Sequence, residues 1–500
     1  MLKAANRQRF RSGARHGLAL ALPFLMAAPL IACIAGPDYH PPSLAVPASF
    51  SQTSPADEPE TLWWRGFGDP LLDRLIAEAL AANLDVRQAA LRVEEARQQA
   101  RIVGAAAQPT VSATAQASDT RLSKTTSFAA LLGGSAPPGS SPVGAPGATV
   151  DTYQVGFDAS WELDLFGGNR RAVEAAKART EAAVWSQRDA EIILTAEVAR
   201  AYLDYRTLNR RIAIADQLLA ARTEALDYNQ VRRRNGLTAT LDERRAERDI
   251  AADAASRQGL LAQRSGQAHA LAVLLARPPL DLTAELAATS GETRSPRDIP
   301  VGLPSELLLR RPDLRAAERD LAAASADIGV AAADLYPSFS LTGAVDLVSG
   351  SLSRLISADS FQPSIAAGLV DPLLDGGRRR ATLGLKQTQA QEAQLAYQGA
   401  VLTALKDVED ALTRLSADRS REDQFRTSEA AARDVLATTQ AQHNAGLATG
   451  LDLLAAQAVL LNASDSLAQA RAATDQDVVA LYKALGGGWD NRRIDDAGGL

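Results

Sequence analysis

The sequence predicts an α+β membrane protein built from two copies of one unit, each with two strands and long helices. The first observation is a stretch from Tyr153 to Leu165 in which apolar and polar residues alternate strictly. Period two is typical of a strand with one apolar and one polar face. The second is a proline-free stretch from Asn169 to Asn235, rich in Ala, Glu and Arg, which predicts one very long helix. The third is that the same succession of strand and helix begins again at Ser364.

Anchor residues of the first copy recur in the second at nearly constant offsets. Asp85 and Pro109 are followed 228 residues later by Asp313 and Pro337. Beyond a Gly-, Pro- and Ser-rich loop at 132–149, the offset falls to 209 or 210 residues, so the first copy is longer in that loop. Two long copies indicate a duplicated unit and not an array of short repeats. The junctions between strand and long helix are marked by Gly167 and Gly168 in the first copy and by Gly376 and Gly377 in the second.

The N-terminus has the pattern of a bacterial lipoprotein signal. Residues 1–32 contain five basic residues and then an apolar stretch at 18–28, which is too short for a membrane span. They end in the letters LIAC, which resemble a lipobox, so we expect Cys33 to carry the lipid. Cys33 is the only cysteine of the chain, which excludes an intrachain disulfide.

The mature chain divides into a tether and two repeats. Residues 33–60 are rich in Pro, Ser and Asp and predict an extended tether. The first structural repeat is expected at 61–290 and the second at 291–500. The four strands are expected at 110–117, 153–165, 337–348 and 364–371. The helices of the first repeat are expected at 69–107, 169–235 and 241–275.

Charge and motifs exclude several classes of function. Loss of residues 1–32 changes the net charge from −6 to −11, because five basic and no acidic residues are removed. An acidic protein of this kind is a poor candidate for binding nucleic acid. The four histidines are scattered, and the sequence holds no HExxH, GxSxG, Walker or CxxC motif. We therefore expect no enzyme activity, no catalytic residue, no metal site and no cofactor.

The membrane-spanning part must come from the strands. No segment after the signal has 18 consecutive apolar residues, so a transmembrane helix is not expected. About 9–11 residues let a tilted strand span a bilayer, which makes the fourth predicted strand marginal. Four strands are too few to close a membrane barrel, since the smallest have about 8. The alternating aromatic face favours one barrel shared between several chains.

Several blocks resemble one protein family. They are the lipobox with GPDY at 36–39, WELDLFG at 161–167, and LPS at 303–305 followed by RRPDL at 310–314 and YP at 336–337. Together they are similar to TolC-like outer membrane factors of the NodT lipoprotein type, over nearly the whole mature chain.

The resemblance implies a homotrimer with a 12-stranded outer-membrane barrel and a long periplasmic coiled-coil barrel of helices. It implies an exit duct that passively conducts small molecules, such as drugs or metal ions, as in multidrug resistance. The expected partners are a periplasmic adaptor (membrane fusion) protein and an inner-membrane transporter, often of the resistance-nodulation-division type. The expected location is the bacterial outer membrane, with a lipid (palmitate) anchor.

The resemblance also implies functional positions where the long helices turn back. It places a periplasmic gate at Asp452, with Asp242 as a weaker candidate. The family has a further acidic position where this chain has Ala455. The turns themselves are implied to dock the adaptor, through Gly236, Leu237 and Thr238 in the first copy and Gly446, Leu447, Ala448 and Thr449 in the second. Helix capping is the alternative role for the glycines, and a solvated turn carboxylate is the alternative for Asp452.

Two other functions are compatible with the sequence. One is the exit duct of a type I protein-secretion system, which has the same fold. The other is a periplasmic coiled-coil adaptor or scaffold lipoprotein without a pore, against which the alternating strands argue. The sequence does not identify the cargo.

Overall fold

The computed structural model describes residues 34–51, 61–123, 149–287, 294–296 and 299–487. The predicted signal peptide, Cys33 and most of the loop at 132–149 lie outside the described residues. Contacts divide the chain into two compact units. Unit 1 holds residues 1–40, 97–179 and 321–393, and unit 2 holds 41–96, 180–320 and 394–500. No helix among the described residues is both long and apolar enough to cross a membrane.

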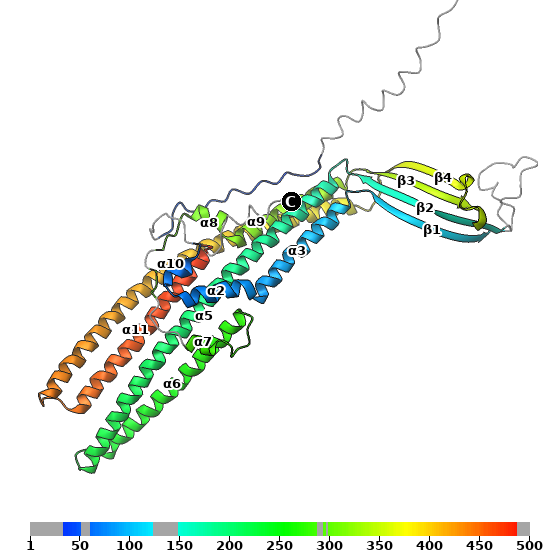
Figure 1. Ribbon diagram of the computed structural model, residues 1–500. Coiled ribbons are helices and arrows are strands. Elements are labelled where there is room, and N and C mark those ends of the chain that lie inside the picture. The colour runs from blue at the N-terminus through cyan, green and yellow to red at the C-terminus, as the bar shows by residue number, and fades with distance from the viewer. Residues whose placement is uncertain (1–33, 52–60, 124–148, 288–293, 297–298, 488–500) are drawn as a thin grey trace, which may run out of the picture. The chain divides into compact units, whose positions relative to one another are not determined.

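The sheet belongs to unit 1 and contains the four predicted strands (Figure 1). They pair antiparallel in the order β1 (Thr110–Arg121), β2 (Thr149–Leu163), β3 (Ser338–Ser349) and β4 (Phe361–Val370). β4 begins three residues before the predicted start and has 10 residues, which is enough to span a bilayer. Pro363 lies within it, and proline is tolerated there because β4 is an edge strand of the described sheet.

The strand register gives the sheet two faces of different chemistry. Phe157 of β2 lies opposite Val345 of β3, and the alternation of each strand is in phase with that of its neighbour. The odd-numbered residues of all four strands therefore share one face, which is mainly apolar. The even-numbered residues share the other, which is mainly Ser, Thr, Gln, Asp and Glu. The predicted two-faced strand thus holds for the whole sheet.

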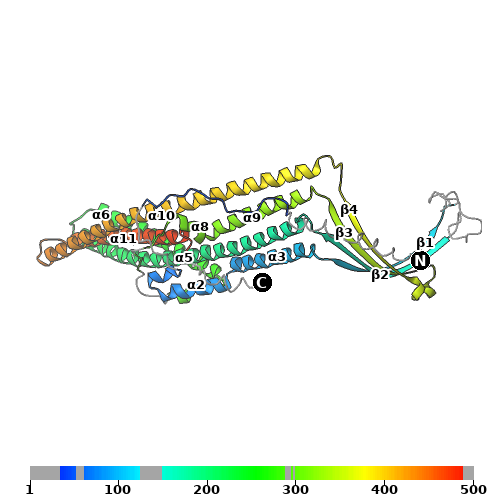
Figure 2. The same ribbon diagram turned by 90° about the horizontal axis from the view of Figure 1, so that it is seen from above.

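Two long helices and two return helices repeat the same lengths. α5 (Gly168–Arg234) and α10 (Arg378–Asn444) have 67 residues each. α6 (Thr240–Leu274) and α11 (Gly450–Ala484) have 35 each. In unit 2, α6 lies beside α5 and α11 lies beside α10 in both views (Figures 1 and 2). The equal lengths agree with the predicted two-copy repeat.

The helix predicted at 69–107 is two helices, which corrects that expectation. α2 (Pro70–Ala82) and α3 (Leu84–Ala105) are separated by Asn83. The Asn83 side chain accepts hydrogen bonds from the N–H groups of Asp85 and Val86, and its amide donates to the carbonyl of Leu274. Asparagine is a strong N-cap, so it starts a new helix where apolar spacing alone predicts continuation.

Unit 2 has an aromatic core around Trp63. This residue lies in the 3-10 helix η2 (Trp63–Phe67), where Trp63, Trp64 and Phe67 are all buried. The Trp63 ring stacks on Tyr482 of α11 at 5.2 Å between centroids. Among the described residues of both units, the other helices are α7 (Thr283–Ala287), α8 (Pro304–Arg310) and α9 (Pro312–Ala333), and the short 3-10 turns η3 (Leu352–Arg354) and η4 (Ala358–Ser360) precede β4.

Candidate functional site: helix turns, strand–helix junctions and sheet faces

Both helix turns end in the same backbone geometry. Gly236 and Gly446 have φ of 72° and 75°, a left-handed conformation that glycine adopts without strain. The N–H of Leu237 donates to the carbonyl of Arg232, and the N–H of Leu447 donates likewise to Gln442. The leucine after each glycine is exposed, by 67% at Leu237 and 81% at Leu447. The two turns therefore present matching apolar tips.

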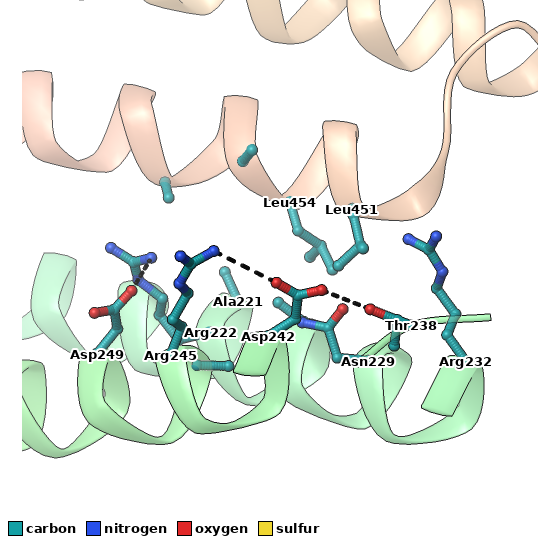
Figure 3. A pocket seen from close by; sticks show the side chains of 14 residues that line it. Ala221, Arg222, Asn229, Arg232, Thr238, Asp242, Arg245, Asp249, Leu451 and Leu454 are labelled. Atoms are coloured by element: carbon teal, nitrogen blue, oxygen red, sulfur yellow. Dashed lines mark hydrogen bonds and ion pairs between the residues drawn. The ribbon is translucent and has the colours of Figure 1, made fainter. Parts of the chain in front are cut away.

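A cavity of about 350 Å³ adjoins the first turn, between α5, α6 and α11 (Figure 3). Asp242 lies at its wall, where it accepts a hydrogen bond of 2.5 Å from Thr238 and pairs with Arg245 at 3.6 Å. Leu451 and Leu454 of α11 face these groups from the opposite side. The cavity therefore joins a charged wall to an apolar one. Its other lining residues are Ala221, Arg222, Ala225, Asn229, Arg232, Ala246, Asp249, Ala455 and Ala458.

The predicted gate residue Asp452 has a structural partner in the second turn. Its Oδ2 accepts hydrogen bonds from the N–H and the hydroxyl of Thr449, at 2.8 and 2.7 Å. The Asp452 N–H donates in return to Thr449 Oγ1, which completes a capping box at the start of α11. These bonds from Thr449, with a smaller contribution from Arg232, hold the pKa of Asp452 below its ordinary value. Asp452 is exposed, so its carboxylate is ionised and accessible at neutral pH.

The two strand–helix junctions are also built alike. Asp164 caps α5 by accepting the N–H groups of Asn169 and Arg170, and it pairs with the Arg170 side chain. Asp375 caps α10 by accepting the N–H of Arg379, whose side chain it also binds at 3.0 Å. An arginine at a helix N-terminus is disfavoured by the helix dipole, and the capping carboxylate offsets that effect. Neither aspartate was predicted from the sequence as a site residue.

The segment 34–38, called the strap below, lies against the first junction. The N–H of Ala35 donates to the carbonyl of Phe166, and a side chain at Gly167 would meet Ile34. Gly36 has φ of 86° and lies so close to Gly329 of α9 that an added Cβ would stand 2.4 Å from the Gly329 Cα. The backbone of the strap therefore lies so close to α9 that only glycine fits at this contact.

A buried arginine fixes the strap to α5. Only 5% of Arg171 is exposed. Its guanidinium donates to Asp38 at 2.6 Å, to Glu174 at 2.8 Å and to the carbonyl of Ala35 at 3.3 Å. The hydrogen bond from Arg171 lowers the pKa of Asp38. Buried charges need this degree of pairing, so the strap completes the environment of Arg171. The GPD motif at 36–38 is visible in the sequence, but composition alone does not predict that this segment contacts Arg171.

Among the described residues, no group of three or more His, Cys, Asp or Glu side chains could hold a metal ion. The carboxylates at the turns and junctions instead serve as helix caps or ion-pair partners. The described residues thus give one sheet with an apolar and a polar face, and along the chain β2 and β4 are each followed by a long helix with a return helix. A two-faced sheet combined with long helices is the class of structure found in outer membrane channels with helical extensions.

The comparisons with known proteins agree with that class. The chain matches the family described as outer membrane efflux protein over residues 75–277 and 303–487, and it belongs to this family. It is 33% identical over 478 residues to outer membrane protein OprJ of Pseudomonas aeruginosa, covering 94% of this chain and 96% of OprJ. It is 31% identical over 468 residues to nodulation protein T of Rhizobium leguminosarum bv. trifolii, covering 92% and 96%. The solved structure of the outer-membrane channel OprN aligns with a TM-score of 0.80 and 33% identity, covering 91% of this chain and all of that one.

These findings confirm the predicted family, the α+β fold class, the outer membrane location and the function of an outer membrane efflux channel. The family's members are channel proteins, not enzymes. The gate residues, the docking tips and Cys33 lipidation stay predictions.

Proposed function

We propose that three copies of the chain form the exit duct of a tripartite efflux system, through which small molecules pass passively to the exterior. The observation that carries this proposal is the sheet with one apolar and one polar face. A sheet of this kind turns its apolar face to lipid and its polar face to water. β1 and β4 each have one neighbour in the described sheet. Three sheets joined edge to edge would make a closed ring of twelve strands, which satisfies every edge in lipid.

The partners in this proposal are a periplasmic adaptor and an inner-membrane transporter. The helix turns are the proposed docking tips, because each presents an exposed leucine, Leu237 or Leu447, next to a glycine with open space around it. Exposed apolar residues at the tip of a rigid hairpin suit a protein partner. The tips are Gly236, Leu237 and Thr238, and Gly446, Leu447, Ala448 and Thr449.

The lipid anchor in this proposal is Cys33, which directly precedes the strap. Because Ile34 and Ala35 contact the first strand–helix junction, acyl chains on Cys33 would enter the bilayer beside the strands. Mass spectrometry of the membrane-extracted protein tests this: we expect an acylated N-terminal peptide that begins at Cys33 and is absent from Cys33→Ser.

The gate in this proposal is a ring of three Asp452 carboxylates, with Asp242 as the weaker candidate. Asp452 is exposed and ionised, and clustered carboxylates around an axis attract cations. Asp242 is less available, because it is paired with Arg245 and bound by Thr238. The capping role of Asp452 means that an alanine variant would change helix structure and charge together.

The test is single-channel conductance of the detergent-purified protein in planar bilayers, with two variants of one residue. Asp452→Asn removes the charge and retains an oxygen that caps α11, whereas Asp452→Ala removes both. Discrete openings that grow equally in both variants would support a charge gate. Openings that change only in Asp452→Ala would assign the effect to the helix cap. A folded trimer that never conducts, even with its adaptor, would contradict the channel function.

A further inference from the structure

The charged residues of the sheet differ between its two faces. The four strands contain six charged residues. Asp119, Arg121 and Asp151 lie on the mainly apolar face, in the last rungs beside the loop between β1 and β2. The other three are Asp158, Glu162 and Asp346, and all lie on the polar face. The polar face of the described strands therefore carries carboxylates and no basic residue.

Asp346 of β3 is in an unusual state for a carboxylate. It is only 8% exposed, and its Oδ1 is buried without a hydrogen-bond partner among the described residues. It lies opposite Gly156 of β2, where an added Cβ would be 1.9 Å from that Oδ1. The glycine therefore makes room for the carboxylate. A buried, unpaired carboxylate is unfavourable unless a cation or water supplies the missing partner.

A second carboxylate is next to it on the same face. Asp158 lies opposite Ala344, two residues before Asp346 on β3, so the two aspartates are diagonal neighbours. Asp158 Oδ2 accepts a hydrogen bond of 3.0 Å from Thr114 of β1. β2 and β3 are the inner strands of the sheet. A second copy that joined at β1 or β4 would leave this pair in place.

We propose that Asp346, together with Asp158, is the site that makes the strand-lined part of the channel prefer small cations. This inference rests on the proposed channel function and assigns charge selection to the sheet and not to the helix turns. Two carboxylates in each chain are too few for a dedicated divalent cage, which takes six or more oxygen ligands. Rings of Asp or Glu are a common basis of cation selectivity. The ligand is therefore a hydrated monovalent cation such as K⁺.

The first experiment is the reversal potential of the purified channel under a KCl gradient. We expect a cation preference in the wild type that falls several-fold in Asp346→Asn and less in Asp158→Asn. Asp119→Asn is the matched control: it removes the same charge from the opposite face and should leave the reversal potential unchanged. A reversal potential that is unchanged in Asp346→Asn but shifted in Asp452→Asn would overturn the proposal and place selectivity at the helix turn.

A second experiment needs no conduction, so a closed channel does not leave the proposal undecided. The melting temperature of the detergent-solubilised protein is compared in KCl and in N-methylglucamine chloride, whose cation is bulky. A cation that binds the folded state raises its stability. We expect KCl to raise the melting temperature of the wild type and of Asp119→Asn, and the difference to disappear in Asp346→Asn. An equal difference in Asp346→Asn would refute the cation site, whereas silent bilayers with the expected melting shifts would contradict only the channel function.

Discussion

The two strand–helix junctions have the same helix cap but differ in the burial of the arginine that follows it. In each, an aspartate caps the long helix and binds an arginine that lies 209 residues from its counterpart: Arg170 with Asp164 and Arg379 with Asp375. The next residue is also arginine in both copies. Arg171 is buried under the strap, whereas Arg380 is exposed. The same residue type in the same repeat position is thus a core residue in one copy and a surface residue in the other.

The cause of the difference lies outside the repeats. The strap is part of the tether and, among the described residues, it covers the first junction and leaves the second exposed. Gly329, on which the strap rests, belongs to the second repeat, while Phe166 and Arg171 belong to the first. Corresponding residues of a duplicated chain can therefore share their secondary structure and still have different surroundings.

Of the variants considered, Gly36→Ala is expected to have the largest effect on stability, because it should release the strap from the first junction. The added Cβ would stand 2.4 Å from the Gly329 Cα, and φ of 86° disfavours any L-residue. The strap should therefore separate from α9. We expect a loss of about 3 kcal/mol in the free energy of unfolding. Hydrogen exchange at the Ala35 amide, which donates to Phe166, measures the release directly.

Gly68→Ala is the control for this variant. Gly68 has a similar φ of 66° but open space around it, so only backbone strain of about 1 kcal/mol is expected. An Ala35 amide that stayed protected in the Gly36→Ala protein would show that this contact tolerates a side chain.

Arg171→Ala and Arg380→Ala compare the two copies directly. Arg171→Ala removes hydrogen bonds to Asp38, Glu174 and Ala35 from a buried position, and we expect a loss of about 2 kcal/mol. Arg380→Ala changes an exposed residue and should stay within about 0.5 kcal/mol of the wild type. Denaturant unfolding of the detergent-solubilised protein measures both. Equal losses would mean that the strap contributes nothing to the first junction.

The two helix turns differ in the residue that caps the return helix, and single substitutions can remove this difference. Ala239 and Thr449 precede α6 and α11 with nearly the same backbone angles, and an aspartate follows three residues later in both. Only Thr449 makes a capping box. Thr449→Ala should lower stability by about 1 kcal/mol, and Ala239→Thr should raise it by up to about 1 kcal/mol. Thermal unfolding followed by circular dichroism measures the pair, and two neutral results would argue that capping does not limit the stability of these helices.

The smallest expected effect is the pH dependence of the strap. The pKa of Asp38 is held below its ordinary value of 3.8, chiefly by the hydrogen bond from Arg171. Its contribution is therefore complete above pH 3.8 and is lost as the pH falls through the lower value of the folded state. Hydrogen exchange at Ala35 should rise in that acidic range in the wild type. Asp38→Asn should show the faster exchange already at neutral pH, and Asp375→Asn, at the other junction, should not.

Elements with a regular period could be predicted from the sequence. The alternation from Tyr153 onward and the proline-free run after Asn169 fixed β2 and α5 within a few residues. The fourth strand was predicted too short at its start because Pro363 interrupts the pattern, and an edge position that permits proline is a property of the sheet. The break at Asn83 was missed because a local cap overrides apolar spacing.

The contacts that bury Asp346 and dock the strap join residues far apart in the chain, so local sequence patterns could not predict them. The period places Asp346 on the polar face, but its burial depends on Gly156, which lies opposite only through the β2–β3 register. The strap has no period at all, and its docking depends on glycines and an arginine far apart in the sequence. The spacing of Thr449 and Asp452 is that of a capping box, so the capping role of Asp452 could have been predicted from the sequence.

The strap also has a consequence for how such a chain could arise by fusion. Two separate half-length chains would bring two amino termini to every four strands, and each junction could be covered by its own. Joining them end to end removes one of the two termini. On the proposal that Cys33 is lipidated, the fused chain would carry one lipidated cysteine for every four strands. Among the described residues no second strap covers the other junction, where Leu373, Leu374 and Arg380 are exposed.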